Sequence, residues 1–453
     1  MQNPVQGSWF HPSQAWRLLL VIFLVLVLLV PILMIGGVIA ERRMRRQEAI
    51  EDVSAKWGRR QVITGPALVI PYTHRWTETG DHGKTITHTE LRYATFLPER
   101  LAIRGRVAGE SRSRGIYTVP VYRASLALEG AFARPSFREW NIGEPDVDWG
   151  KARLVVGISD VRAVQEQPAL RWNGRRVGFL PGTGPDPYLD SLSGIHAVVG
   201  VGAKEESLEF SFPVELNGSV GAYFTPFGGQ TSVELSSNWE SPSFQGNWLP
   251  SRRDVSSHGF TATWSIPFLG RNYPQAWLAG SVEPRVIEAS RFGVDLIAPV
   301  DEHRMAERSV KFAGLFILLT FASIWLTEVL ARLRVHPIQY LLLGAALCLF
   351  YLLELSLAEH LGFSPAYALA SLAIVGMVAA YSISVLRTVW RAGTLAAVVV
   401  ALYGYLYVLL TNEDYALLVG SIGLFLILAV IMFLTRRVDW YASPLPEGSS
   451  EPR

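Results

Sequence analysis

Three ionisable residues near one end of a long apolar segment are the strongest chemical candidates in this chain. Glu354, Glu359 and His360 lie at or just beyond the end of the uncharged stretch that starts after Tyr340. Ionisable groups within membrane-spanning segments are costly and usually functional. A carboxylate and an imidazole could carry a proton, line an ion path or perform acid–base chemistry. The simpler interpretation is that they form polar caps and interhelical hydrogen bonds.

The spacing of these residues argues against a single active centre. Neighbouring residues on a helix point about 100° apart, so Glu359 and His360 would converge only if a turn unwound. A conducting path would need ionisable groups at several depths, and Glu328 is the other candidate, near the far end of the preceding span. Transport and membrane enzymology therefore remain the alternative hypotheses.

The other end of the same segment carries the motif His336-Pro337-Ile338-Gln339-Tyr340. Proline is well tolerated in the first turn of a helix, where its missing N–H has no partner to lose. The motif could contact a partner or set the angle at which the helix enters the membrane. We favour the second interpretation.

The rest of the chain offers no recognisable catalytic layout. The sequence contains no G-x-S-x-G, H-E-x-x-H or P-loop motif, and Cys348 is its only cysteine. His74, His82 and His88, with Asp81 and Glu90, could hold a metal only if two strands brought them together; an exposed polar loop is the favoured interpretation. We therefore predict no catalytic, cofactor-binding or metal-binding residues, and a protein that is not an enzyme.

Composition identifies the elements that position these residues. Half of the 453 residues are hydrophobic, mean hydropathy is +0.24, and the net charge of +2 gives no case for nucleic-acid binding. Apolar residues gather in one N-terminal block and one larger C-terminal block. The predicted spans are 16–40, 312–330, 338–357, 366–386, 395–410 and 415–434, each close to the length that crosses a bilayer. The first is too long for the apolar core of a cleaved signal peptide.

Charged residues in the short loops predict the orientation of these spans. Arginines at 332, 334, 387, 391, 436 and 437 lie on one side, and Glu359, His360, Glu413 and Asp414 on the other. Basic loops favour the cytoplasm, so residues 1–15 and the tail 436–453 are predicted to be cytoplasmic. Residues 41–308 are then predicted to be periplasmic, although the arginines just after the first span oppose this rule.

The segment between the two apolar blocks has the pattern of an all-β domain. A helical continuation is expected from Glu41 to Arg60, and then short alternating runs such as Leu208 to Phe212 lie between turn residues. Asn217-Gly218 is read as a tight turn. The predicted fold class is an α-helical polytopic membrane protein of about six spans, arranged one plus five, with a large sandwich-like β domain.

Several stretches together resemble the CreD family of bacterial inner-membrane proteins. They include Gly65 to Pro71, Phe96 to Glu99, Ser237 to Trp239, Pro242 to Phe244, Gly246 to Pro250, His336 to Leu341, Glu359 to Phe363, Phe433 to Arg436 and Asp439 to Tyr441. The resemblance covers nearly the whole chain. It implies an inner-membrane protein of the cell envelope, associated with envelope integrity, stress tolerance and the regulon of the CreB–CreC two-component system. It implies no catalytic residues.

Three functions are compatible with these observations. The favoured one is a non-enzymatic envelope protein whose periplasmic β domain binds an envelope component or protein partner. The others are an ion or small-molecule transporter using intramembrane carboxylates, and a membrane enzyme acting on lipid or cell-wall precursors. The expected surroundings are a lipid bilayer and a periplasmic partner, and the sequence does not indicate an oligomeric state.

Overall fold

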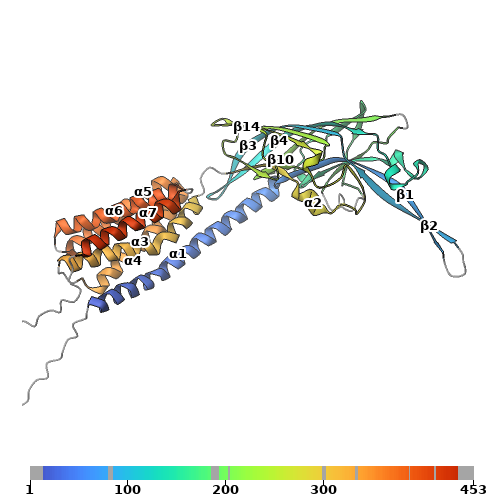
Figure 1. Ribbon diagram of the computed structural model, residues 1–453. Helices are drawn as coiled ribbons and strands as arrows, with labels where there is room; N and C mark the ends of the chain where they lie inside the picture. The colour runs from blue at the N-terminus through green and yellow to red at the C-terminus, as the bar shows by residue number, and fades with distance from the viewer. Residues whose placement is uncertain are drawn as a thin grey trace, which may run out of the picture. The chain divides into compact units, whose positions relative to one another are not determined.

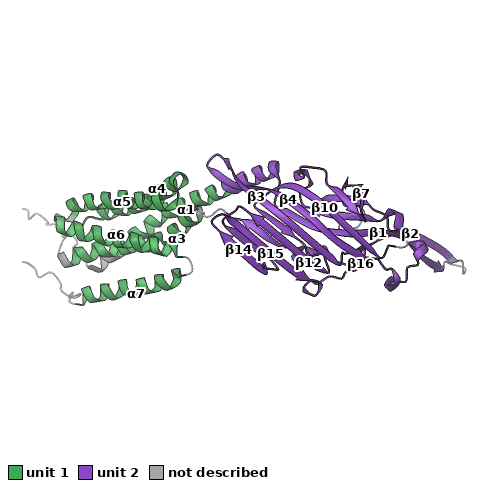
Figure 2. Ribbon diagram, turned by 90° about the horizontal axis from the view of Figure 1, so that it is seen from above, with its two compact units in different colours: residues 1–45, 300–453 green, residues 46–299 purple. Residues whose placement is uncertain are grey.

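A computed structural model describes residues 14–79, 85–184, 193–202, 205–297, 302–331, 335–386, 388–412 and 415–436. Its contacts divide the chain into a helical unit, residues 1–45 and 300–453, and a β domain, residues 46–299 (Figure 2). The predicted loop residues Asp81, His82, Glu413 and Asp414, and the loop arginines other than Arg391 and Arg436, lie outside the described residues.

Long helices form the helical unit, and α1 continues into the β domain (Figure 1). They are α1 (Gln14–Trp57), α3 (Glu302–Ala331), α4 (Pro337–Leu361), α5 (Phe363–Leu386), α6 (Val389–Thr411) and α7 (Ala416–Thr435). Among the described residues, these six helices are long and apolar enough to cross a membrane. The predicted arrangement of one plus five helices is confirmed.

The β domain holds the strands of two sheets. The strands are β1 (Gln61–Thr79), β2 (Thr85–Phe96), β3 (Arg100–Arg114), β4 (Tyr117–Ala133), β5 (Arg153–Ile158), β6 (Ala169–Trp172), β7 (Arg175–Gly178), β8 (Leu180–Pro181), β9 (Gly194–Val198), β10 (Ser207–Ser219), β11 (Gly221–Phe224), β12 (Gln230–Ser237), β13 (Pro242–Gly246), β14 (Arg252–Ser256), β15 (Gly259–Pro267), β16 (Ala276–Leu278) and β17 (Phe292–Leu296). The helices within the domain are short: α2 (Pro284–Ala289) and 3-10 turns at Arg138–Trp140, Glu144–Asp146, Trp149–Lys151, Val161–Ala163 and Phe268–Gly270.

Both sheets bury one face in a shared core, which makes the domain a sandwich. A nine-stranded sheet has the order β13-β17-β11-β1-β5-β9-β8, with β2 paired to β1 and β16 paired to β2. An eight-stranded sheet has the order β14-β15-β12-β3-β4-β10-β6-β7. Leu68 of the first sheet and Trp264 of the second belong to one continuous cluster of buried apolar side chains. The prediction of an all-β sandwich-like domain is confirmed.

Strand alternation explains which face of the eight-stranded sheet is buried. In β15 the side chains of Phe260, Ala262, Trp264 and Ile266 are buried, while Thr261 and Ser265 between them are exposed. This period of two leaves the opposite face polar.

Two local predictions were wrong. Asn217-Gly218 is not a turn, because both residues lie inside β10 and pair with Arg123 and Tyr122 of β4. The ring of Tyr122 occupies the space that a Cβ on Gly218 would need, so packing rather than a turn requires glycine there. The first helix ends at Trp57 rather than Arg60, because the chain then turns into β1.

Candidate functional site

Glu354 is a fully buried carboxylate inside the helical unit. Its side chain is 0% exposed on α4, and its Oε2 accepts a hydrogen bond of 2.8 Å from Ser309 Oγ on α3. Its other oxygen, Oε1, has no hydrogen-bond partner among the described residues. Tyr351, Tyr367 and Tyr403 lie near enough to interact electrostatically with its carboxyl group. The contact with Ser309 is an interhelical hydrogen bond, which is the simpler of the two interpretations given to this residue.

The other two ionisable candidates do not join Glu354. Glu359 Oε1 lies 3.5 Å from Arg42 Nε of α1, and its side chain is 11% exposed. The side chain of His360 is exposed. The structure therefore does not assemble Glu354, Glu359 and His360 into one acid–base centre. Glu354 instead connects α4 to α3, and Glu359 connects α4 to α1.

At the same end of the helical unit, further hydrogen bonds connect α3 to α6. Arg308 donates hydrogen bonds to the carbonyl oxygens of Leu409 and Leu410, at 3.2 and 3.1 Å. These carbonyls lie in the last turn of α6, where the backbone has no partner within its own helix. Arg308 and Ser309 are adjacent on α3, so one turn of α3 connects to both α4 and α6.

The motif at the opposite end is a helix cap. Nδ1 of His336 accepts from the backbone N–H of Ile338 at 3.3 Å, and Oε1 of Gln339 accepts from the N–H of His336 at 2.9 Å. Pro337 is the first residue of α4, where no N–H is needed. These contacts support the interpretation that the motif sets the start of the helix.

Tyr340 links this cap to the preceding helix. Its hydroxyl donates to Glu328 Oε2 at 3.0 Å, and both side chains are buried, at 2% and 6% exposed. The N–H of Val335 also donates to Glu328 Oε1, at 3.4 Å. Glu328 thus holds the connection between α3 and α4.

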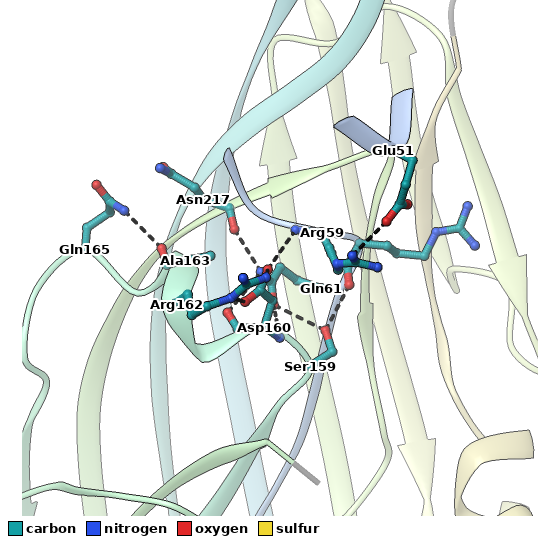
Figure 3. Close-up of polar contacts among 10 residues, drawn as sticks. Glu51, Arg59, Gln61, Ser159, Asp160, Arg162, Ala163, Gln165 and Asn217 are labelled. Carbon is teal, nitrogen blue, oxygen red and sulfur yellow. Dashed lines mark hydrogen bonds and ion pairs between the residues drawn. The ribbon is translucent and has the colours of Figure 1, made fainter. Parts of the chain in front are cut away.

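A polar cluster connects the chain just after α1 to the rest of the β domain (Figure 3). We call it the junction cluster, and it consists of Arg59, Gln61, Ser159, Asp160, Arg162 and Asn217. Its centre is Gln61, which is 1% exposed at the start of β1. Nε2 of Gln61 donates to the carbonyl of Asn217 at 3.0 Å and to that of Asp160 at 3.4 Å. Oε1 of Gln61 accepts from Ser159 Oγ and from the N–H of Asp160, both at 3.3 Å. One side chain therefore joins three segments distant in sequence.

Asp160 supplies the charge of the junction cluster. Arg162 donates to both of its carboxylate oxygens, at 3.0 and 3.2 Å, and the N–H of Arg59 donates to Oδ2 at 3.3 Å. Burial alone would raise the pKa of Asp160, but the hydrogen bonds and charge of Arg162, with the N–H of Arg59, hold its pKa below the usual value. The carboxylate is therefore ionised at neutral pH.

The last turn of α1 packs into the same region of the β domain. Ser219 Oγ of β10 donates to Ser54 Oγ at 2.7 Å, and Trp57 Nε1 donates to the carbonyl of Tyr122 at 3.2 Å. The guanidinium of Arg112 lies 3.6 Å from the centre of the Trp57 ring, a cation–π contact. At Gly58, φ is +145° and a Cβ would lie 2.7 Å from the carbonyl oxygen of Asn217, so only glycine fits.

The outer part of the β1–β2 hairpin is a two-stranded ribbon, which we call the hairpin arm (residues 73–79 and 85–92). Among the described residues beyond Tyr72, the two strands of the arm pair only with each other, with Trp76 opposite His88. Arg75 of the arm forms an ion pair of 2.9 Å with Asp146. The ring of Trp76 stacks with the rings of His74 and His88, whose centroids lie 5.6 and 5.1 Å from its own. Trp76, Ile86 and Leu91 are 40%, 48% and 57% exposed.

Two of the three histidines considered for a metal site, His74 and His88, lie on the described part of the arm. Both rings stack on Trp76, and no group of three potential metal ligands occurs in the part of the chain that the structure describes. His82 and Asp81 belong to the loop outside that part.

Sequence reasoning found the buried carboxylate and the cap but missed their partners. Ser309 and Arg42 are ordinary polar residues in sequence. Glu328 was noted as an ionisable group in a span, but its contact with Tyr340 was not predicted, because only the packing of the helices creates it. Gln61 and Asp160 carried no signal, because a lone glutamine before a strand and a lone aspartate in a loop are common.

Comparisons with known proteins agree on one family. The family model described as inner membrane protein CreD matches residues 13–441. The chain is also similar to the inner membrane protein CreD of Escherichia coli (strain K12), with 33% identity over 433 residues, which is 95% of each protein.

Two solved structures were also matched, at much lower similarity. One is an M1 zinc metallopeptidase of Deinococcus radiodurans, bound to a Tyr-Ser-Ala substrate, with 10% identity and a TM-score of 0.21 over 78% of this chain and 96% of that one. The other is a putative nutrient binding protein of Legionella pneumophila, with 9% identity and a TM-score of 0.23 over 48% and 82%. TM-scores this low carry no argument about fold or function.

Proposed function

Because the chain belongs to the CreD family of inner membrane proteins, we propose that it is a non-enzymatic envelope-integrity protein of the stress response. In this proposal the β domain is periplasmic, and it binds an envelope component or partner protein through the hairpin arm. The helical unit anchors the domain in the inner membrane.

The exposed hairpin arm is the observation that carries the proposal. An isolated two-stranded ribbon is only marginally stable in water, and this one exposes Trp76, Ile86 and Leu91. Tryptophan is enriched among residues that dominate binding energy at protein interfaces. The arm also presents free strand edges on both sides beyond Tyr72, which a partner strand could extend.

The eight-stranded sheet provides a contrasting surface. Its outer face carries polar side chains such as Thr263 and Ser232, and the ion pair of Arg104 with Glu129. Such a face is well solvated without a partner, so it serves as the reference surface in the test.

Site-specific photocrosslinking in intact envelopes tests the proposal. A photoreactive amino acid is placed at Trp76 or Leu91 on the arm, and at Ser232 or Thr263 on the reference surface. We expect a discrete crosslinked product from the arm positions and none from the reference positions. No product from the arm, or the same products from both surfaces, would refute binding through the arm.

The proposed orientation has its own test. Single cysteines at Ser232 and at Arg436, in a chain carrying Cys348→Ser, are treated with a membrane-impermeant thiol reagent on cells with a permeabilised outer membrane. We expect labelling at position 232 only. Labelling at 436 but not at 232 would place the β domain in the cytoplasm.

Glu354 supports a second candidate function, ion or proton transport. Its buried Oε1 lacks a hydrogen-bond partner among the described residues, which is unusual for a carboxylate in an apolar interior. Proteoliposomes containing the full chain and a pH-sensitive dye would measure proton flux. Flux that disappears in the Glu354→Gln variant supports transport, and no flux above protein-free vesicles rejects it.

A further inference from the structure

The helical unit contains a groove between α3, α6 and α7 that is apolar along most of its length and cationic at one end. Its volume is about 640 Å³, within the usual range for small-molecule sites. We propose that this groove is a binding site for one anionic phospholipid, with an acyl chain between the helices and the phosphate on Arg391. The proposal is independent of what the β domain binds.

The spacing of the lining residues shows that each helix contributes one continuous face. On α7 the lining positions include Leu426, Val430 and Leu434, which recur every four residues. These side chains are 56%, 56% and 43% exposed, and α7 buries none of its residues among the described part of the unit. A helix with this much apolar surface on its inward side is left without a protein partner there.

The attachment of α7 explains why the groove opens at one end. Near the start of α7, Tyr405 of α6 donates to the carbonyls of Val419 and Gly420, at 3.0 and 3.1 Å. The same ring occupies the space that a Cβ on Gly423 would need. These contacts hold the first half of α7 closely against α6, and the groove lies along its second half, from Leu426 to Leu434.

The length of the groove matches one leaflet of a bilayer. On α6 the lining residues run from Arg391 to Leu402, which at about 1.5 Å per residue spans roughly 16 Å. The hydrocarbon core is about 30 Å thick, so the groove extends from the membrane surface to about its middle. A single acyl chain covers that depth.

The polar groups at the end of the groove favour an anionic headgroup. Arg391 lines the groove, and none of the described residues that line it is acidic. Thr394 Oγ1 donates to the carbonyls of Trp390 and Arg391, and Thr327 Oγ1 to that of Ser323, so these hydroxyls remain only as acceptors. A phosphate can therefore bind through Arg391, and basic pockets between membrane helices commonly bind anionic lipid headgroups in this way.

Crosslinking with a photoreactive lipid tests this assignment. The full chain is placed in nanodiscs of phosphatidylcholine with a small fraction of phosphatidylglycerol that carries a diazirine on its acyl chain. We expect labelling to concentrate on peptides covering 319–327 and 426–434, relative to the exposed surface of α5 around Met377. Unlabelled phosphatidylglycerol should compete, and added phosphatidylcholine should not.

Three variants separate this site from general lipid contact. Arg391→Gln should reduce labelling in the groove about tenfold, since a charge-assisted hydrogen bond is lost. Arg436→Gln, at the same end but outside the groove lining, should leave labelling unchanged. Ala322→Trp, which fills the groove from α3, should abolish labelling while the chain keeps its elution volume in gel filtration.

Each contrary result overturns the proposal. Equal labelling of α5 and the groove, or equal competition by phosphatidylcholine, would identify ordinary surrounding lipid. Crosslinks between two copies of the chain at α7 would identify a second copy as the occupant. Unchanged labelling in Arg391→Gln would remove the role of the cation.

Discussion

Replacing Gln61 with leucine is expected to loosen the attachment of α1 to the β domain. Leucine has a similar size but cannot replace the four hydrogen bonds of the buried amide (Figure 3). The bond to the Asn217 carbonyl, at 3.0 Å, is the shortest, and its loss costs about 1 kcal/mol. The N–H of Asp160 would also lose the Gln61 acceptor, which costs a further 1–3 kcal/mol or so in a buried position.

Loss of the bond to the Asp160 carbonyl adds little to the destabilisation, because that carbonyl still accepts a hydrogen bond of 3.2 Å from the N–H of Ala163. The expected loss is therefore about 3 kcal/mol. Since about 1.36 kcal/mol corresponds to a factor of ten, amide hydrogen exchange in residues 59–63 and 158–164 should become roughly 100-fold faster in the variant.

The assay uses the full chain in detergent and compares exchange peptide by peptide. Gln165→Leu is the control, because Gln165 carries the same side chain in the same region, is exposed, and donates one short-range bond to the Ala163 carbonyl. That control should change stability by no more than about 0.5 kcal/mol. Equal exchange in Gln61→Leu and Gln165→Leu would refute the reasoning. Gln61→Glu should be worse than leucine at neutral pH, because a carboxylate oxygen would face two carbonyl oxygens.

Three further predictions follow from the same structure. Lowering the pH through the depressed pKa of Asp160 should increase amide hydrogen exchange at the junction cluster, after correction for intrinsic exchange rates. A carboxyl group with a lowered pKa stabilises the fold above its unfolded pKa, which is near 4, and this stabilisation is lost as the group protonates. The Asp160→Asn variant should lack this pH dependence. Glu354→Ala should lower the free energy of unfolding of the detergent-solubilised chain by about 2–4 kcal/mol, because a cavity forms and Ser309 Oγ loses its acceptor. Thermal melting of the two proteins measures this difference. Glu354→Gln should cost less than about 1 kcal/mol, since the amide oxygen still accepts from Ser309, and equal losses in both variants would contradict this account. Gly344→Leu should destabilise the helical unit by at least about 2 kcal/mol in the same melting assay, because Leu28 and Phe321 occupy the space its side chain would need; a wild-type melting temperature would disprove that close contact.

The sequence predicted the architecture because the architecture follows from composition and periodicity. Apolar stretches long enough to cross a bilayer identified the six helices, and alternation identified the strands of the β domain. The same reasoning mistook Asn217-Gly218 for a turn, because the dipeptide preference is local while the pairing of β10 with β4 is long-range. Propensity cannot report that the ring of Tyr122 needs the space beside Gly218.

The sequence identified single residues of the candidate sites, but not the residues that contact them from other elements. Glu354 was conspicuous because a carboxylate within an apolar stretch is costly, whereas the Ser309 hydroxyl that binds it lies in another helix and has no sequence signal. His336 and Gln339 are close in sequence, so their capping contacts were within reach of local reasoning. Gln61 could not be recognised, because its importance depends on Asn217 and Asp160 arriving beside it in the folded domain.

The contact between α1 and α4 has a consequence for biosynthesis. Cys348 Sγ lies 3.8 Å from the carbonyl oxygen of Leu28, and 320 residues separate the two along the chain. At about 5–20 residues per second, the ribosome needs roughly 16–64 s to make the segment between them. Helix α1 therefore waits through synthesis of the entire β domain before α4 exists, and lipid or the insertion machinery must shield its apolar face during that interval.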